Sequence, residues 1–283
     1  MMKTGLVLEG GAHRAIYVAG VLDVFMEKGI TFDGVVGVSA GAIHGGSYVA
    51  KQKGRNIGYT LKYASDKRYM SFYSLITTGD LVGKKFCYCD LPDKLVPFDY
   101  EAFKKAKTKF YAVCSNLESG EGEIIEIKDM KKQMDVLRAS ASMPLVSQIV
   151  EFDGKKYLDG GIADSIPLRK FQKAGYEKCV VVETRPDGYE KKPNPLAWLA
   201  KIVYRKYPNF VKALVLRHNN YNAELYDIET ASKNGEIFLI KPSKFLKIGR
   251  MEKDPEKLKS MYELGRADAL KNLPNLKKFL SIK

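Results

Sequence analysis

A serine flanked by glycines is the stretch of this sequence with the clearest chemical meaning. Gly37-Val38-Ser39-Ala40-Gly41 follows the apolar run 34–36, which predicts a buried strand, and precedes a helix predicted over residues 42–50. A serine on such a strand-to-helix turn is held in a strained backbone conformation with its hydroxyl exposed, and its neighbours two positions away must be small. The helix behind it directs unpaired N–H groups at the reaction centre. The pattern predicts Ser39 as a nucleophile that attacks an ester or similar acyl group.

A glycine-rich turn, Glu9-Gly10-Gly11-Ala12-His13-Arg14, joins a predicted strand over residues 6–8 to a predicted helix over residues 16–28. Glycines let backbone N–H groups approach a bound oxygen closely, and a helix N-terminus adds favourable polarity. We therefore expect the amides of Gly10, Gly11 and Ala12, with that of Ala40 behind the serine, to form an oxyanion hole. A plain connecting turn and a nucleotide phosphate loop are the alternatives. The missing GxGxxG spacing and Walker lysine disfavour the phosphate loop.

Asp159 is the candidate base. It ends a predicted strand over residues 155–158, and Gly160-Gly161 after it lets the chain turn sharply and present the carboxylate at the edge of the sheet. A β-turn aspartate without a catalytic role is the alternative.

The chain has three histidines, at positions 13, 44 and 218. The order Ser39, Asp159, His218 matches the triad order of α/β-hydrolases. In that fold several strands precede the nucleophile, whereas here Ser39 follows only the second predicted strand. We therefore expect His13, His44 and His218 to be structural rather than catalytic.

The elements that must position these residues alternate between strand and helix. Two strands joined through a helix within a short stretch predict a βαβ unit and hence a parallel sheet, with Gly29 capping the helix. Further strands are predicted over 110–115 and 124–127, paired through a turn at Ser119-Gly120, and over 179–182 and 236–241; helices are predicted over 133–140, 167–174 and 254–283. Residues 59–105 show no clear pattern, although 59–73 are a candidate lid or substrate wall.

Composition restricts the class of protein. Of 283 residues, 45% are hydrophobic and 28% charged, which is ordinary for a globular chain. No apolar run approaches the ~20 residues of a membrane span, and the N-terminus lacks the apolar segment of a signal peptide. These features predict a cytoplasmic protein. Cys87, Cys89, Cys114 and Cys179 lack metal-site spacing and are expected to be reduced and structural, with no metal or cofactor bound.

The net charge of +14 indicates attraction to polyanions. The basic residues form no known nucleic-acid-binding motif, so an anionic membrane is the favoured functional partner and a solvated basic surface the default. Residues 195–218 are basic and amphipathic, with a break at Pro208. Such a segment, bearing Trp198 beside Lys201 and Arg205, can lie in a lipid interface; packing over the sheet is the alternative.

Together these motifs resemble the patatin-like phospholipase family. The resemblance covers residues 4–186 and rests on the turn at 9–14, the serine turn at 37–41 and Asp159-Gly160-Gly161, with residues 139–144 and 164–167 also similar. It implies an α/β protein with a three-layer α/β/α fold and a mostly parallel central sheet. Residues 1–190 would form the catalytic core, and residues 191–283 a helical C-terminal extension packed on the same domain.

The resemblance also implies a mechanism. Ser39 would attack the acyl carbonyl, Asp159 would take its proton and later activate water, and Arg14 would brace the glycine-rich turn or contact a charged substrate. The implied activity is a serine acyl hydrolase of the lipase, phospholipase A or lysophospholipase type, acting on a phospholipid or other acyl-ester lipid without a cofactor. An acyltransferase and a catalytically weak lipid-binding or regulatory protein are the alternatives.

The glycine-rich turn departs from the family pattern. Ala12 stands where a third glycine is usual, Ala15 replaces a glycine after the arginine, and His13 occupies a usually apolar position. An alanine donates its N–H as a glycine does, but positive φ is costly for it. The conformation of Ala12 therefore bears on activity.

Overall fold

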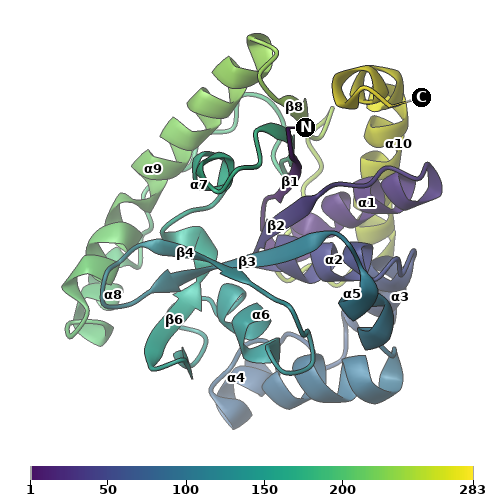
Figure 1. Cartoon of the computed structure of the whole chain (residues 1–283). Coiled ribbons are helices and arrows are strands. Elements are labelled where there is room, and N and C mark those ends of the chain that lie inside the picture. Colours follow the sequence, from purple (N-terminus) through teal and green to yellow (C-terminus); the bar gives the residue numbers. More distant parts are fainter. Residues whose placement is uncertain (1, 283) are drawn as a thin grey trace.

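A computed structural model describes residues 2–282 (Figure 1). The strands are β1 (Thr4–Leu8), β2 (Gly34–Val38), β3 (Lys109–Asn116), β4 (Gly122–Glu126), β5 (Val150–Phe152), β6 (Lys155–Asp159), β7 (Lys178–Val182) and β8 (Phe238–Ile240). The α-helices are α1 (Ile16–Glu27), α2 (Ala40–Val49), α3 (Arg55–Tyr63), α4 (Phe72–Thr78), α5 (Tyr100–Lys105), α6 (Met134–Ser140), α7 (Leu168–Lys173), α8 (Ala197–Val203), α9 (Pro208–Lys233) and α10 (Pro255–Leu280). Shorter 3₁₀ turns η1 (Ala12–Ala15) and η3 (Gly160–Ile162), and the π-helical segment η2 (Phe86–Leu95), complete the described elements.

One mixed sheet contains the strands. Its hydrogen-bonded succession is β5-β6-β3-β2-β1-β7-β8, with β4 also paired to β3. The five strands β3, β2, β1, β7 and β8 run parallel to one another, and β4, β5 and β6 pair antiparallel. Helix α1 connects β1 to its parallel neighbour β2, as the βαβ pattern predicted. The sheet is therefore mostly parallel around β1.

Helices cover both faces of this sheet because successive side chains of a strand point to opposite faces. Leu6 and Val35 pack into a core with α1, α2 and α10, whereas Val7 and Val36 pack into a second core with α7 and α9. Figure 1 shows these two groups of helices on opposite sides of the strands. The fold is α/β with three layers, as expected.

The C-terminal part of the chain contributes to every layer. Strand β8 extends the sheet by pairing in parallel with β7. Helix α9 covers one face through Tyr221 and Ile228, and α10 covers the other by packing along α1.

Two glycines hold α1 and α10 in backbone contact. A Cβ atom on Gly20 would lie 2.1 Å from the Tyr262 carbonyl oxygen, and one on Gly265 would lie 2.1 Å from the Tyr17 carbonyl oxygen. Real Cβ atoms do not approach so closely, so this crossing requires glycine at both positions.

Several boundaries differ from the sequence-based expectations. Helix α2 begins at Ala40, directly behind the serine, rather than at residue 42. Pro208 does begin a new helix, but α9 continues to Lys233, well beyond the predicted amphipathic segment. Strand β5 was not expected; it forms a hairpin with β6 through Asp153 and Gly154, which have φ of 50° and 70°. Residues 59–105 contain most of α3 together with α4, η2 and α5.

Helix α10 spans most of the predicted segment 254–283, whose last residue lies outside the described chain. Among residues 2–282, none of the helices combines the length and the apolar character that a membrane span requires.

Candidate active site

Strand β3 brings the candidate serine and aspartate together. Strand β2 ends where Val38 pairs with Val113 of β3, and β6 ends where Asp159 pairs with the next residue, Cys114. Strand β4 pairs with the same stretch of β3 and occupies its other edge, so β2 and β6 share one edge. They approach each other end to end because one is parallel and the other antiparallel to β3. Ser39 and Asp159 therefore meet at a single register position.

The two side chains are hydrogen-bonded. Ser39 Oγ donates to Asp159 Oδ2 at 2.8 Å, which is within reach for direct proton transfer. The other carboxylate oxygen, Oδ1, accepts from the Gly161 N–H at 2.8 Å. Asp159 is only 6% exposed. One oxygen thus faces the serine, and the other holds the carboxylate against the backbone.

The turn around Ser39 has the strain that its sequence predicted. Ser39 has φ 55° and ψ −126°, between the end of β2 and the start of α2. A Cβ atom on Gly37 would lie 2.5 Å from Ala42 N, and one on Gly41 would lie 2.6 Å from the Leu8 carbonyl oxygen. Small residues are therefore required at both positions. Ser39 N–H also donates to Ser140 Oγ at 3.0 Å, a contact that fixes the turn from α6.

The glycine-rich turn packs against this serine. A Cβ atom on Gly10 would lie 2.7 Å from the Val38 carbonyl oxygen and 2.9 Å from Ser39 Cβ. Within the described residues, the amides of Gly10, Gly11 and Ala12 donate to no protein acceptor. These N–H groups are thus available to a bound oxygen beside the serine.

Ala12 adopts a positive φ, the conformation that is costly for an alanine at this position of the turn. Gly11 has φ 151° and Ala12 has φ 50°. The turn therefore places a residue with a side chain in the left-handed region, where the cost is about 1 kcal/mol. Contacts around the turn must offset this strain energy.

Contacts with the end of β7 and with α9 brace the turn. Glu9 is buried, and its Oε2 accepts from the N–H and the Oγ1 of Thr184 at 2.5 and 2.8 Å. Its Oε1 accepts from the Tyr221 hydroxyl at 2.7 Å. Arg14 Nε donates to Thr184 Oγ1 at 3.3 Å. Sequence reasoning gave Glu9 no role of its own, because its partners lie far along the chain.

The surroundings of Asp159 act on its pKa in opposite directions. Burial raises the pKa of Asp159, while the Arg217 guanidinium and the hydrogen bonds from Ser39 and Gly161 lower it. Arg217 Nε donates to the Gly161 carbonyl oxygen, and a Cβ atom on Gly161 would lie 3.1 Å from both Arg217 Nη2 and Asp159 Oδ1. A raised pKa makes a carboxylate a better proton acceptor. Arg217 was not identified from the sequence.

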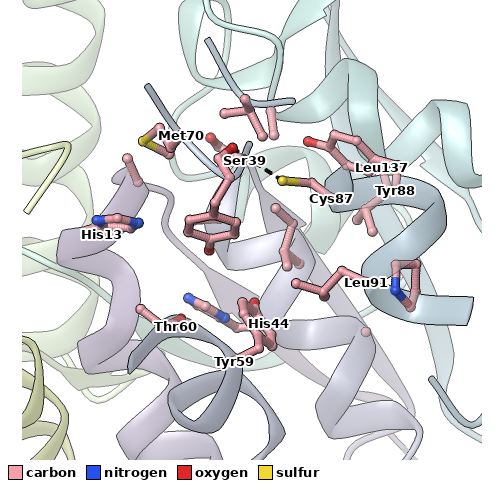
Figure 2. Close-up of a pocket in the computed structure, with 18 of the residues that line it drawn as sticks. His13, Ser39, His44, Tyr59, Thr60, Met70, Cys87, Tyr88, Leu91 and Leu137 are labelled. Atoms are coloured by element: carbon pink, nitrogen blue, oxygen red, sulfur yellow. Dashed lines mark hydrogen bonds between the residues drawn. The ribbon is translucent and has the colours of Figure 1, made fainter. Parts of the chain in front are cut away.

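Ser39 lies where two cavities meet. The first, here called the apolar cavity, has a volume of about 100 Å³ and lies among α2, α3, η2 and α6 (Figure 2). It is lined mainly by apolar and aromatic side chains, including Ile16, Ile43, Tyr59, Met70, Tyr88, Leu91, Met130, Leu137 and Met143. Tyr59, Thr60, Tyr69 and Met70 belong to the segment expected to form a lid or substrate wall.

The second, here called the cationic cleft, has a volume of about 700 Å³ and opens on the other side of the serine. Asp159 and the glycine-rich turn line it, together with the basic residues Arg14, Arg185, Lys191, Lys192, Arg217 and Arg250. Ala12, Ser39 and Met143 line both spaces.

In the described chain no histidine is hydrogen-bonded to Ser39 or Asp159. His13 Nδ1 donates to the Glu252 carbonyl oxygen at 2.6 Å, and burial lowers its pKa. His44 is buried beside the apolar cavity, where burial lowers its pKa to about 4 (Figure 2). His218 Nδ1 lies 3.1 Å from the Val215 carbonyl oxygen of its own helix. The geometry joins Ser39 to a carboxylate without an intervening imidazole.

No cysteine thiol of the described chain is hydrogen-bonded to Ser39 or Asp159. All four are free thiols, and Cys114 and Cys179 are buried in the sheet. Among residues 2–282, no three histidine, cysteine or acidic side chains are grouped so that they could hold a metal ion.

Comparison with protein-family models assigns most of the chain to two families. A model described as patatin-like phospholipase matches residues 6–171, which is more than half of the chain. The protein belongs to this family. A second model, described as a domain of unknown function (DUF6363), matches residues 207–281.

The similar proteins differ in length. Uncharacterized protein YjjU of Escherichia coli K12 is 26% identical over 274 residues, covering 93% of this chain and 75% of that protein. Lysophospholipase NTE1 of Meyerozyma guilliermondii is 26% identical over 188 residues, covering 63% of this chain but only 12% of that protein. The Candida albicans protein of the same name is 25% identical and is covered to 13%. The crystal structure of VipD from Legionella pneumophila aligns with 97% of this chain and 67% of its own, at 14% identity and a TM-score of 0.48.

Proposed function

We propose that this protein hydrolyses acyl esters of lipids through a dyad of Ser39 and Asp159. The observation that carries the proposal is the 2.8 Å hydrogen bond from Ser39 Oγ to Asp159 Oδ2, beside unpaired amides. Membership of a phospholipase family supports it.

In this mechanism Asp159 accepts the serine proton as Oγ attacks the acyl carbonyl. The amides of the glycine-rich turn and of Ala40 stabilise the oxyanion, an effect that is typically worth ~10²–10³ in rate per donor. The leaving alcohol takes the proton from Asp159 as the acyl–oxygen bond breaks. Asp159 then accepts a proton from water as the water attacks the acyl-enzyme, and it returns that proton to Ser39 Oγ as the bond between the acyl group and the serine breaks and the fatty acid leaves.

The apolar cavity is the proposed site of the acyl chain. It adjoins Ser39, its walls are largely apolar, and its volume is small. A cavity of about 100 Å³ favours a single chain, as in a lysophospholipid. The wide cationic cleft gives water access to the same serine, as hydrolysis requires.

A fluorophosphonate probe and an ester assay test the dyad. Wild-type protein is expected to be labelled at Ser39, and Ser39→Ala to lose both labelling and turnover. Asp159→Asn should cost nearly as much, whereas His218→Ala should stay within about two-fold because that ring contacts neither residue. Ester turnover retained in Ser39→Ala would remove the mechanism.

Two other outcomes would favour the alternative functions. An unlabelled, inactive wild type would favour a lipid-binding protein without catalysis. Transfer of the acyl group to an added glycerolipid would favour an acyltransferase.

We also propose that the protein binds the surface of an anionic membrane through α8. Ala200 and Tyr204 pack inward, while Trp198 and Ile202 are 61% and 58% exposed. The apolar side of this segment therefore does not simply pack over the sheet. Lys201 lies on the same helix, and the net charge of +14 supports an anionic surface. The proposed location is the cytoplasm, where the free thiols stay reduced.

A further inference from the structure

The cationic cleft gathers basic side chains that form no salt bridge within the described chain. Arg185, Lys191, Arg217 and Arg250 all line it beside Ser39. In the described part of the chain, none of them lies within 4.0 Å of an acidic oxygen. Charged groups held close together in a partly buried site repel one another, so such a group of unpaired cations favours an anionic ligand.

Aromatic rings and backbone contacts hold two of these cations in position. The Lys191 ammonium lies 4.1 Å from the centre of the Tyr221 ring, and the Arg185 guanidinium lies 4.0 Å from that of Tyr189. Asn222 of α9 clamps the backbone of Lys191, because its Oδ1 accepts from the Lys191 N–H at 2.8 Å and its Nδ2 donates to the Lys191 carbonyl at 3.1 Å. Arg185 Nε is buried and has no partner within the described chain. The cations are thus preorganised and keep donors free.

The charge around Lys191 is positive on balance. Burial and the cations of Arg217, Arg14 and Arg185 lower its pKa to about 7, whereas Glu9 acts in the opposite direction. The carboxylate of Glu9 already accepts hydrogen bonds from Thr184 and Tyr221. A bound anion would relieve this repulsion and restore the charge of the lysine.

These cations come from a part of the chain that the phospholipase model does not cover. That model ends at residue 171, whereas Arg185 and Lys191 follow β7 and Arg217 lies on α9. Arg217 and Arg250 fall within residues 207–281, the domain of unknown function. The C-terminal part therefore adds its own charged groups to the space beside Ser39.

We propose that the cationic cleft binds the phosphate of a single-chain acyl lipid, with Arg185, Lys191 and Arg250 as its ligands. The inference rests on the proposed function and specifies its substrate class. Because the apolar cavity and the cationic cleft meet at Ser39, the acyl chain and the phosphate lie on opposite sides of the ester carbonyl. Guanidinium groups match phosphate oxygens in bidentate geometry, and an ammonium adds a point charge. Arg217 remains committed to Gly161 and to the electrostatics of Asp159.

Matched substrates test this assignment. The hydrolysis of 1-acylglycerol 3-phosphate and of the 1-acylglycerol with the same chain is compared in wild type, Lys191→Met and Arg185→Met. The preference for the phosphate-bearing substrate, taken as the ratio of kcat/KM values, should fall about 10-fold in each variant, mainly through KM. Lys259→Met, an exposed lysine on α10 outside both cavities, is the matched control and should keep the wild-type ratio. Unchanged ratios in both cleft variants would overturn the inference.

Inorganic phosphate separates a lipid headgroup from a free anion. It should compete with the phosphate-bearing substrate, raising its KM without changing kcat, and more weakly in the variants. Two results together would overturn the headgroup assignment: added phosphate changes kcat for the neutral 1-acylglycerol, and the wild type shows no preference for the phosphate-bearing substrate. They would indicate a site for free phosphate instead.

Calorimetric titration of glycerol 3-phosphate into Ser39→Ala protein tests the site without catalysis. Binding should be lost when Lys191→Met and Arg185→Met are combined, in protein whose circular dichroism and thermal unfolding match those of the parent. If that loss is seen but no ester is hydrolysed, the phosphate site stands and the proposed hydrolase fails. If Ser39-dependent hydrolysis is present but glycerol 3-phosphate does not bind, the hydrolase stands and the phosphate site fails.

Discussion

Two opposing effects set the pKa of Asp159, and both matter for its proposed role as a base. Burial raises its pKa and so strengthens its affinity for the serine proton, whereas Arg217 stabilises the ionised form. Only the ionised carboxylate can accept that proton, so both influences are needed near neutral pH. The guanidinium is partly buried, which makes its effect stronger than that of a surface charge.

The pH profile of ester hydrolysis should report the pKa of Asp159. Activity falls as the pH drops through the pKa of Asp159, so the acid limb of kcat/KM should lie above 3.8, the ordinary value for an aspartate. Arg217→Gln removes the nearby cation and should move that limb upward by about one unit. The measurement uses a neutral ester, so that loss of a phosphate contact does not interfere. Lys259→Gln is the control, and an identical acid limb in Arg217→Gln would contradict the electrostatic role.

Among the elements, the crossing of α1 and α10 is the most tightly constrained contact. Gly20→Ala and Gly265→Ala should each lower the free energy of unfolding by about 3 kcal/mol, because the added methyl group meets a backbone carbonyl that cannot turn aside. Gly58→Ala is the matched control: this glycine of α3 has no atom within 4 Å of its missing Cβ, so the helix should gain about 0.5–1 kcal/mol. Urea unfolding measures all three variants. Equal stabilities would contradict the close approach of the helices.

Sequence reasoning found the elements whose signal is local. The apolar runs at 6–8 and 179–182 predicted β1 and β7, and the glycines around Ser39 predicted the strained turn because a short tight turn leaves its own pattern. Helix boundaries were less accurate, since α9 keeps its helix beyond residue 218 by packing on the sheet. Strand β5 was missed because its partner β6 and their turn define it more than its own residues do.

Residues of the candidate site also differ in whether a local sequence motif identifies them. Ser39, Asp159 and the glycine-rich turn each stand in a short recognisable motif, and the structure brings these motifs together. Arg217 and Lys191 have no such motif. They lie in a charged segment whose residues look alike in sequence, and only the path of α9 and of the chain after β7 decides which of them face the serine.

At the scale of the whole molecule, residues 191–282 pack on both faces of the sheet and extend one edge of it. We propose residues 1–190 as the catalytic core and residues 191–283 as an extension that folds with it in a single transition. A fragment ending at residue 190 would leave α1 without α10 and one face of the sheet without α9. It should therefore fail to fold, with no cooperative thermal transition and rapid proteolysis, whereas the full chain should unfold in one step. A stable, folded fragment would contradict this view.

Membrane binding should also depend on the charge of the whole molecule. Binding to vesicles rich in phosphatidylglycerol is expected to weaken as salt is added and to exceed binding to neutral phosphatidylcholine vesicles. Replacing Lys201 and Arg205 together by glutamate should weaken it further, by about ten-fold at moderate salt. Lys259→Glu on α10 lowers the net charge without altering α8, so it serves as the control for net charge alone and should weaken binding much less. Binding that ignores both salt and the double replacement would exclude the proposed surface.

The end-to-end arrangement of β2 and β6 on β3 has a wider consequence. Because β3 fixes the reacting pair, the geometry of the pair does not depend on the length or content of the polypeptide between α2 and β3. That loop carries α3 and η2, which wall the apolar cavity. Evolution or engineering can therefore exchange this wall, and with it the preferred fatty acid, while the chemistry stays untouched.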